Sequence, residues 1–280
     1  DERGGLLRRF VKVFDDIGEI SQRRLETCVV DLATRATREG IGREHEREAC
    51  HHVDRVADAL GPEDVLHVEL TLDLERAVPL APLSVHAEIV RPGRKVQVAE
   101  VVIADDEGRR LARASVLAIR RREMTLPDGL IRPVEPQIAD RSVGQSSLDW
   151  DFPDDQLVFH ADGTEHRVVK GSFSEPGPAT DWIRLRVPVL PGVEPTGFQR
   201  VVAAADFLNG ISSVVDLSEA TFINPDLTVT VHRLPVGEWV AVDAVTRFTD
   251  EGIGTAEADL YDERGRLGRA VQTLLFEPVG

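Results

Sequence analysis

Two stretches of the chain share one strand pattern at positions 157 residues apart: LTLDLER at residues 70–76 and LTVTVHR at residues 227–233. Apolar and polar residues alternate in both, which places the apolar side chains of a strand on one face and the polar side chains on the other. The likeness continues further along, because RLARA at residues 110–114 matches RLGRA at residues 266–270. A shared pattern over several strands predicts a duplicated module, and the apolar face of each sheet needs a helix to cover it.

Helical and strand-forming segments follow one another in the order that such a duplication requires. Residues before Gly61 have helical composition, and four segments of strand composition follow, separated by turns such as RPGR and DDEG. A stretch rich in Pro, Asp, Gly and Ser then reads as a linker, and PTGFQRVVAAADFLNGISSVV predicts a helix ahead of a second run of strands. We predict an α+β fold in four parts: a helical N-terminal segment of unassigned role, a first module, a linker and a second module, at residues 1–44, 45–123, 124–156 and 157–280.

Composition excludes several classes of partner. The chain has 280 residues and a formal net charge of −16, whereas nucleic-acid binding needs a basic surface that releases counterions from phosphates. No apolar run approaches the roughly 20 residues that cross a bilayer, so we expect no membrane partner. The first residues lack the basic and apolar regions of a signal peptide, and we therefore expect the protein in the cytoplasm.

Three stretches of the second half resemble the type II (TesB-like) acyl-CoA thioesterases, which have a double hot-dog fold: ADFLNGISSVVD, FINPDLTVTVHRLPVGEW and YDERGRLGRAVQTLLF. The resemblance is good over residues 157–276 and fair over residues 65–122. It implies two modules, each with a long helix packed against an antiparallel sheet. It also implies hydrolysis of an acyl-CoA substrate to a free carboxylic acid and CoA.

In that family, as the resemblance implies, a carboxylate, an amide and a hydroxyl of one module hold and activate the water that attacks the thioester carbonyl. The resemblance places Asp226 at the carboxylate position, as the water-orienting base, and Gln272 at the amide position. Both groups suit the chemistry, since a carboxylate accepts the water's proton and a carboxamide both donates and accepts hydrogen bonds. Arg247 occupies the hydroxyl position, so Thr246, one residue away, and Thr228 are the candidates for that role.

Four further residues are candidates for substrate binding: Asp206, Asn209, Gly210 and Arg247. On the predicted helix, Asp206 and Asn209 either polarise the thioester carbonyl or form an ordinary polar stripe. The basic pieces RPGRK, residues 91–95, and RRR, residues 120–122, either meet the phosphates of CoA or are solvated strand ends.

The two modules differ at the positions that carry the chemistry. Glu69 stands where Asp226 stands in the second copy, but Val116 stands where Gln272 does. We therefore expect the second module to be catalytic and the first to be structural.

No metal or bound cofactor is implied by the resemblance. A helical cluster of His45, Glu48, His51 and His52 lacks the HExxH spacing of zinc enzymes, and a solvated helix face is the simpler interpretation. The oligomeric state stays open, with a homo-oligomer among the expectations.

Two alternatives remain beside hydrolysis. A protein that binds acyl-CoA or an acyl chain without turnover is favoured by the unmatched hydroxyl position. A hydratase or dehydratase of the same fold is less favoured, because Phe222 and Leu227 replace the aspartate and histidine of the motif Asp-x-Asn-Pro-Leu-His. Ser212 and Ser213 do not form the GxSxG motif of α/β-hydrolases.

Overall fold

A computed structural model gives the fold of the chain. It describes residues 65–78, 83–131, 136–146, 159–173, 175–188, 194–215 and 219–278. The helical segment predicted for residues 1–44, the helix expected at the start of the first module, and the cluster of His45, Glu48, His51 and His52 lie outside these ranges. Within them, no helix is both long enough and apolar enough to cross a membrane.

The first module contributes four antiparallel strands: β1 (Val65–Leu74), β2 (Ser84–Arg91), β3 (Val96–Ala104) and β4 (Arg110–Arg120). Tight turns join β2 to β3 and β3 to β4, as the RPGR and DDEG signals predict. Gly108 has a φ of 75° in the second of these turns, a conformation that L-residues with a Cβ rarely adopt.

The second module contributes two short helices and seven strands, after the short helical turns η3 (Arg141–Val143) and η4 (Phe159–Gly163). Its helices are α5 (Gly197–Ala205) and α6 (Leu208–Ile211). Its strands are β5 (Thr164–Lys170), β6 (Ala179–Leu185), β7 (Ala220–Ile223), β8 (Asp226–Val231), β9 (Val240–Phe248), β10 (Ile253–Asp262) and β11 (Gly265–Pro278).

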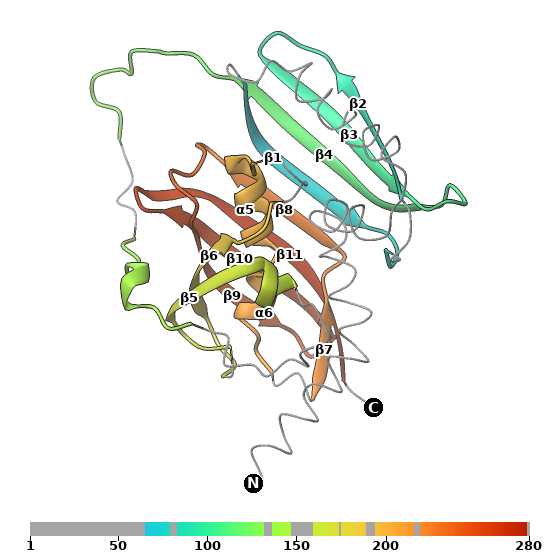
Figure 1. Ribbon diagram of the computed structural model, residues 1–280, viewed down its shortest axis with the longest axis vertical. Coiled ribbons are helices and arrows are strands. Elements are labelled where there is room, and N and C mark those ends of the chain that lie inside the picture. Colours follow the sequence, from blue (N-terminus) through green and yellow to red (C-terminus); the bar gives the residue numbers. More distant parts are fainter. Residues whose placement is uncertain are drawn as a thin grey trace.

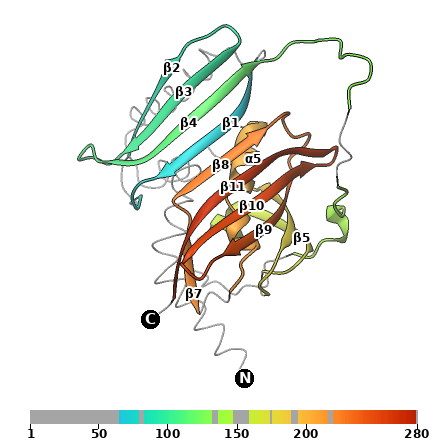
Figure 2. The same ribbon diagram turned by 180° about the vertical axis from the view of Figure 1, so that it is seen from behind.

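All eleven strands form a single sheet in the order β2-β3-β4-β1-β8-β11-β10-β9-β6-β5, with β7 paired to β11 (Figures 1 and 2). The two modules meet where β1 pairs with β8, so the two repeated heptapeptides lie side by side and antiparallel. Thr71 pairs with Thr228, its own counterpart in the other copy, and their hydroxyl oxygens are 3.4 Å apart. The repeat is therefore related by an approximate two-fold axis through this pair.

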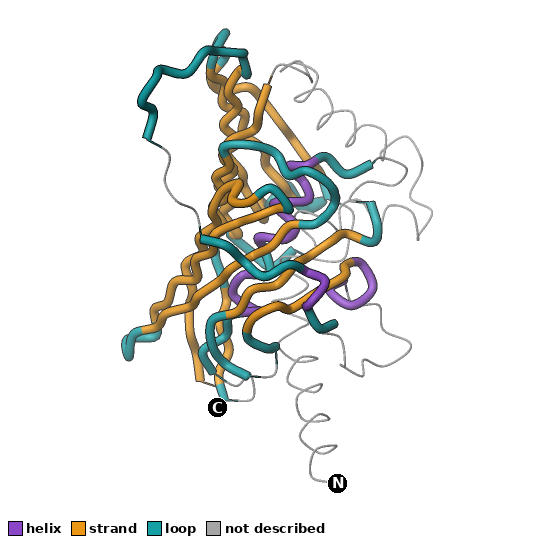
Figure 3. The backbone as a smooth tube through the Cα atoms, turned by 90° about the vertical axis from the view of Figure 1, so that its left-hand side faces the viewer, coloured by secondary structure: helices purple, strands orange, loops and turns teal. Residues whose placement is uncertain are grey.

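The alternation predicted for these strands decides which side chains form the core. On β8, Leu227, Val229 and Val231 are buried, whereas the residues between them are more exposed. Leu72 of β1 pairs with Leu227 and is also buried. Figure 3 shows both described helices on one side of the strands, and this is the buried side.

The helix predicted from PTGFQRVVAAADFLNGISSVV is present but consists of two pieces rather than one long helix. A capping box begins α5, because Thr196 Oγ1 accepts from the Gln199 N–H while Gln199 Oε1 accepts from the Thr196 N–H. The polar residues and the glycine of DFLNGIS have weak helix propensity, which accounts for the break after Ala205.

Part of the predicted linker is attached to the second module. Gln145 forms a β-bridge with Val168 of β5, and Trp182 Nε1 donates a hydrogen bond of 2.9 Å to the Ala139 carbonyl. Residues 136–146 are thus held against β5 and β6, while the module boundaries themselves stay a prediction.

Leu227→Ala tests the shared core. Leu227 is fully buried where the two modules meet, so we expect the free energy of unfolding in urea to fall by about 2–5 kcal/mol. The matched control is Thr230→Ala, on the half-exposed face of the same strand, with a change below about 0.5 kcal/mol. Equal effects of the two substitutions would contradict the assignment of faces.

Candidate active site

Gln272 is a fully buried polar residue of the sheet. Its side chain is fully buried on β11, on the face that also carries Ala270 and Leu274. Ala256 of β10 pairs with Gln272 on one side and with Thr246 of β9 on the other, so one row across the sheet holds the amide and a threonine hydroxyl. Strand alternation therefore presents Gln272 and Thr246 to the same space under the helices.

The junction of the two helices brings a carboxylate to Gln272. Asp206 caps the C-terminal end of α5, and Gln272 Nε2 lies 3.5 Å from Asp206 Oδ1. The Asp206 residue keeps a small exposed area, but its carboxyl group is surrounded by protein, and this burial raises the pKa of Asp206 from 3.8 to about 7. A carboxyl group with such a pKa exchanges a proton readily near neutral pH.

A chain of hydroxyl groups extends from Thr246 to the helix backbone. Ser212 Oγ donates to the Leu208 carbonyl at 2.7 Å, and Ser212 Oγ and Thr246 Oγ1 are 2.7 Å apart. Since the single hydroxyl proton of Ser212 is used on Leu208, Thr246 donates to Ser212. The lone pairs of Thr246 Oγ1 then face the site as acceptors.

One polar atom of this cluster has its hydrogen-bonding capacity unused. Gln272 Oε1 is buried and accepts no hydrogen bond from any residue that the structure describes. A buried carbonyl oxygen without a donor is destabilising by about 1–3 kcal/mol, and in native proteins ordered water commonly supplies the missing hydrogen bond. Gln272 and Asp206 thus have the donors and acceptors to hold one water molecule, on the face of the sheet that also carries Thr246.

A second group of buried polar side chains supports the junction of α5 and α6. The rings of Phe207 and His166 meet edge to face at 5.1 Å, directly beside Asp206 in the chain. His166 Nδ1 lies 2.6 Å from Asp181 Oδ2, and Thr164 Oγ1 lies 2.8 Å from His166 Nε2. This hydrogen-bonded chain fixes the ring against which Phe207 packs, and so fixes where Asp206 enters the site.

The structure does not bring Asp226 to Gln272, and the expected pairing of these two residues is corrected. The Asp226 carboxylate accepts hydrogen bonds from the N–H of Thr273, at 2.7 Å, and from the Thr273 hydroxyl. Thr273 is exposed on the face opposite to Gln272, because successive side chains of a strand point to opposite sides. Asp226 immediately precedes the buried Leu227, and this single position turns its carboxylate away from the helices.

Two other predicted residues also lie on the outer face of the sheet. Thr228 contacts Thr71 across the junction of the modules, and the exposed Arg247 forms an ion pair with Glu257. Neither reaches the space around Gln272. Thr246, the neighbouring candidate for the hydroxyl role, is buried and faces inward.

Asn209 and Gly210, predicted to bind substrate, differ in their surroundings. Asn209 is buried on α6, and its Nδ2 donates to Asn224 Oδ1 at 3.3 Å, whereas Gly210 is exposed. Asn224 Nδ2 in turn lies 3.4 Å from the carbonyl oxygen of Asp226. Asn209 therefore anchors α6 to the start of β8.

Sequence reasoning named Asp206 but gave it a binding role, and it gave Ser212 none. A signal for Asp206 exists, because it is the single acidic residue in the small and apolar run VVAAADFLNG, where a buried carboxylate is costly. Nothing in the sequence shows that Ser212 and Thr246 face each other, since they lie 34 residues apart.

Family models match both halves of the chain. The acyl-CoA thioesterase N-terminal domain matches residues 47–119, and the acyl-CoA thioesterase C-terminal domain matches residues 141–276. A search of the curated proteins found no match.

Solved structures of similar fold come from several bacteria. An acyl-CoA thioesterase II, TesB2, from Mycobacterium marinum is 16% identical, with a TM-score of 0.57, over 85% of this chain and 91% of that chain. A tesB protein from Mycobacterium avium subs paratuberculosis is 15% identical, with a TM-score of 0.53, over 80% of this chain and 83% of that chain. A protein of hot dog fold from Alicyclobacillus acidocaldarius is 14% identical, with a TM-score of 0.60, over 84% and 86%.

At these identities the solved structures establish the hot-dog fold alone, and the assignment to a family depends on the family models. The two models follow one another in N-terminal to C-terminal order and together span more than half of the chain. The chain therefore belongs to the TesB-like hot-dog family of acyl-CoA thioesterases.

Proposed function

We propose that the protein hydrolyses an acyl-CoA to a carboxylic acid and CoA, with a water held by Asp206, Gln272 and Thr246. Membership of the family supports thioester hydrolysis as the general reaction. The observation that carries the specific proposal is the buried, unused acceptor Gln272 Oε1, beside a carboxylate whose pKa is raised to about 7.

In the proposed reaction Asp206 is the general base. The water donates one hydrogen bond to Asp206 and another to Gln272 Oε1 or Thr246 Oγ1, which leaves a lone pair of its oxygen free to attack the thioester carbonyl. As the carbon–oxygen bond forms, Asp206 takes the water's proton and the carbonyl oxygen becomes negative. The second N–H of Gln272 donates to that oxygen. The carbon–sulfur bond then breaks, and the proton on Asp206 goes to the departing thiolate of CoA.

Thr246 has an orienting role in this proposal. Its own proton is committed to Ser212, whose proton is committed to the Leu208 carbonyl. Thr246 Oγ1 therefore acts towards the water only as an acceptor. This fixed direction limits the orientations open to the water, which reduces the entropy lost on reaching the transition state.

Binding of acyl-CoA without turnover has less support than hydrolysis. The argument for binding alone is that an arginine occupies the hydroxyl position of the family. The inward-facing hydroxyl of Thr246 is suited to orient the water in its place. Hydration also has little support, because Phe222 and Leu227 supply neither an acid nor a base.

Asp206→Asn and Asp226→Asn form a matched pair that separates the two candidate bases. We expect Asp206→Asn to lower kcat by about 10²- to 10⁴-fold, since it removes the group that accepts the proton. Asp226→Asn changes a carboxylate on the opposite face, and we expect kcat within about threefold of wild type. Thiol release from a panel of acyl-CoAs measures both. Loss of activity in Asp226→Asn, with Asp206→Asn active, would reverse the assignment.

The rate of hydrolysis should depend on the ionisation of Asp206. Only the carboxylate form accepts a proton, so we expect kcat to rise about tenfold per pH unit on the acid side and to level off above a midpoint near the raised pKa of about 7. A pH–rate profile for thiol release measures this midpoint. A profile already flat from pH 5 upward would contradict the role of this carboxyl group.

The free energy of unfolding should also depend on the ionisation of Asp206, because burial favours the neutral carboxyl group in the folded state. Because the pKa of Asp206 is about 7 in the folded chain and about 3.8 when unfolded, the folded state binds more protons between these values. Stability is then full below pH 4, falls as the pH rises to about 7, and is flat above. We therefore compare the free energy of unfolding of Asp206→Asn with that of wild type at two pH values. We expect this difference to shift in favour of the variant by up to about 4 kcal/mol from pH 4 to pH 8.

Urea unfolding at both pH values measures that shift. Thr246→Val is the control, because it removes a site hydroxyl and no titrating group. A gain for Asp206→Asn that is the same at both pH values would contradict the buried, neutralised carboxyl.

A further inference from the structure

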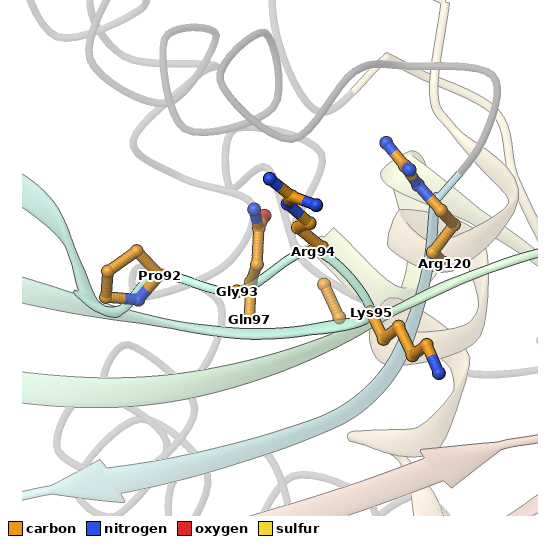
Figure 4. A pocket seen from close by; sticks show the side chains of 7 residues that line it. Pro92, Gly93, Arg94, Lys95, Gln97 and Arg120 are labelled. Atoms are coloured by element: carbon orange, nitrogen blue, oxygen red, sulfur yellow. The ribbon is translucent and has the colours of Figure 1, made fainter.

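A pocket opens at the turn between β2 and β3, beside the end of β4. Its volume is about 460 Å³, and its lining is formed by the turn residues 92–95 together with Gln97, Ala118 and Arg120 (Figure 4). No carboxylate is among these lining residues. The pocket coincides with the two basic pieces that the sequence offered as phosphate contacts.

The cations of this pocket lack the carboxylate partner that many arginines of this acidic chain have. About half of the other described arginines on strands and turns are matched by a carboxylate, for example in the pairs Arg109–Asp105, Arg110–Glu75, Arg113–Glu100, Arg233–Asp262 and Arg266–Asp259. By contrast, Arg94, Lys95 and Arg120 form no ion pair with any described residue. Three uncompensated positive charges in a protein of net charge −16 favour an anionic ligand.

An unused hydrogen-bond acceptor adds a second, independent observation. Gln97 Oε1 is buried and accepts no hydrogen bond among the described residues. Figure 4 shows Gln97, Arg94 and Arg120 projecting from the same side of the strands, whereas Lys95 points away from them. The pocket therefore offers two guanidinium groups and, beside them, an amide oxygen that needs a donor.

The backbone of the turn is held in place. A Cβ on Gly93 would lie 2.3 Å from the Val96 carbonyl oxygen, so only glycine fits there, and Pro92 fixes its own φ. The Arg120 N–H donates to the Lys95 carbonyl at 2.9 Å, which ties the end of β4 to the turn. A ligand would meet side chains on a rigid frame and would lose little entropy in ordering it.

The pocket lies on the same face of the sheet as the proposed catalytic residues. Gln97 pairs with Ala118, which is buried on the face that also holds Leu72, and Leu72 pairs with Leu227 of the second module. Gln272 lies on this face as well. From the strand spacings and the rise per residue, the pocket and Gln272 are roughly 20–25 Å apart. The extended pantetheine and diphosphate of CoA span a distance of this order.

We propose that this pocket binds the phosphorylated adenine nucleotide of CoA. Arg94 and Arg120 bind phosphate oxygens, Lys95 adds positive charge nearby, and Gln97 Oε1 accepts a hydrogen bond from the amino group of adenine. The assignment of CoA as the source of the nucleotide rests on the proposed function, whereas recognition of a phosphorylated adenine nucleotide does not.

Calorimetric titration with adenosine 3′,5′-bisphosphate tests the site without turnover. We expect the double variant Arg94→Ala/Arg120→Ala to bind at least about tenfold more weakly than wild type, with a weaker dependence on salt. The control is Arg109→Ala, at the opposite turn of β3, where the guanidinium is paired with Asp105 and affinity should be retained. Absence of binding to wild type, or equal binding by the double variant, would overturn the proposal.

Gln97→Leu tests the adenine contact separately. We expect wild type to prefer adenosine bisphosphate to inosine bisphosphate by about tenfold, because inosine lacks the amino donor, and we expect Gln97→Leu to lose this preference. If Gln97→Leu still prefers adenosine bisphosphate to inosine bisphosphate, Gln97 does not contact the adenine.

A last comparison separates this proposal from the proposed function. In the double variant we expect the ratio of kcat/KM for acyl-CoA to kcat/KM for acyl-pantetheine to fall about tenfold. An unchanged ratio in an active enzyme overturns the pocket and leaves hydrolysis standing. Nucleotide binding without any thioester hydrolysis overturns the proposed function and supports the pocket. CoA that binds no more tightly than the free bisphosphate would overturn CoA as the source.

Discussion

The pairing of β1 with β8 is the constraint on which the rest of the structure depends. It joins the two copies of the repeat through Thr71 and Thr228, and it converts two sheets into one whose helix-covered face holds the larger core cluster. A smaller buried cluster of Trp182, Ala241 and Tyr261 lies on the other face. Because side chains alternate along every strand, this register decides for the whole sheet which residues meet the helices. Gln272 and Thr246 face the helices, whereas Asp226, which looks equally suitable in the sequence, faces outward.

The proposed site shows why a buried carboxylate is retained in an otherwise apolar interior. Replacing Asp206 by a neutral residue would relieve the burial of its charge, yet the same burial brings its pKa into the range that general-base chemistry uses. Gln272 Oε1 is a similar case, since an unused buried acceptor destabilises the fold unless a ligand or water satisfies it. The buried carboxylate and the unused acceptor both reduce stability, and both have a role in the proposed hydrolysis. Such a conflict between stability and function is common at active sites.

Much of the fold could be predicted from the sequence, because strand alternation and turn chemistry are local signals. The duplicated strands and the RPGR and DDEG turns are present, and the helix predicted from PTGFQRVVAAADFLNGISSVV is present as the two pieces α5 and α6. The family resemblance pointed to Gln272 and Thr246, which lie in one row across the sheet and face the same side. The pairing of the two repeats and the contact between Ser212 and Thr246 could not be predicted, since they join distant segments. The expected pairing of Asp226 with Gln272 was wrong, because a shift of one residue along a strand turns a side chain to the opposite face.

A crystal structure at a resolution that reveals ordered water tests whether Asp206 and Gln272 hold the attacking water. We predict a water within about 2.6–3.2 Å of both Gln272 Oε1 and the Asp206 carboxylate, where it donates one hydrogen bond to each. A structure in which a protein N–H donates to Gln272 Oε1, with the Asp206 carboxylate turned out of the site, would contradict this prediction.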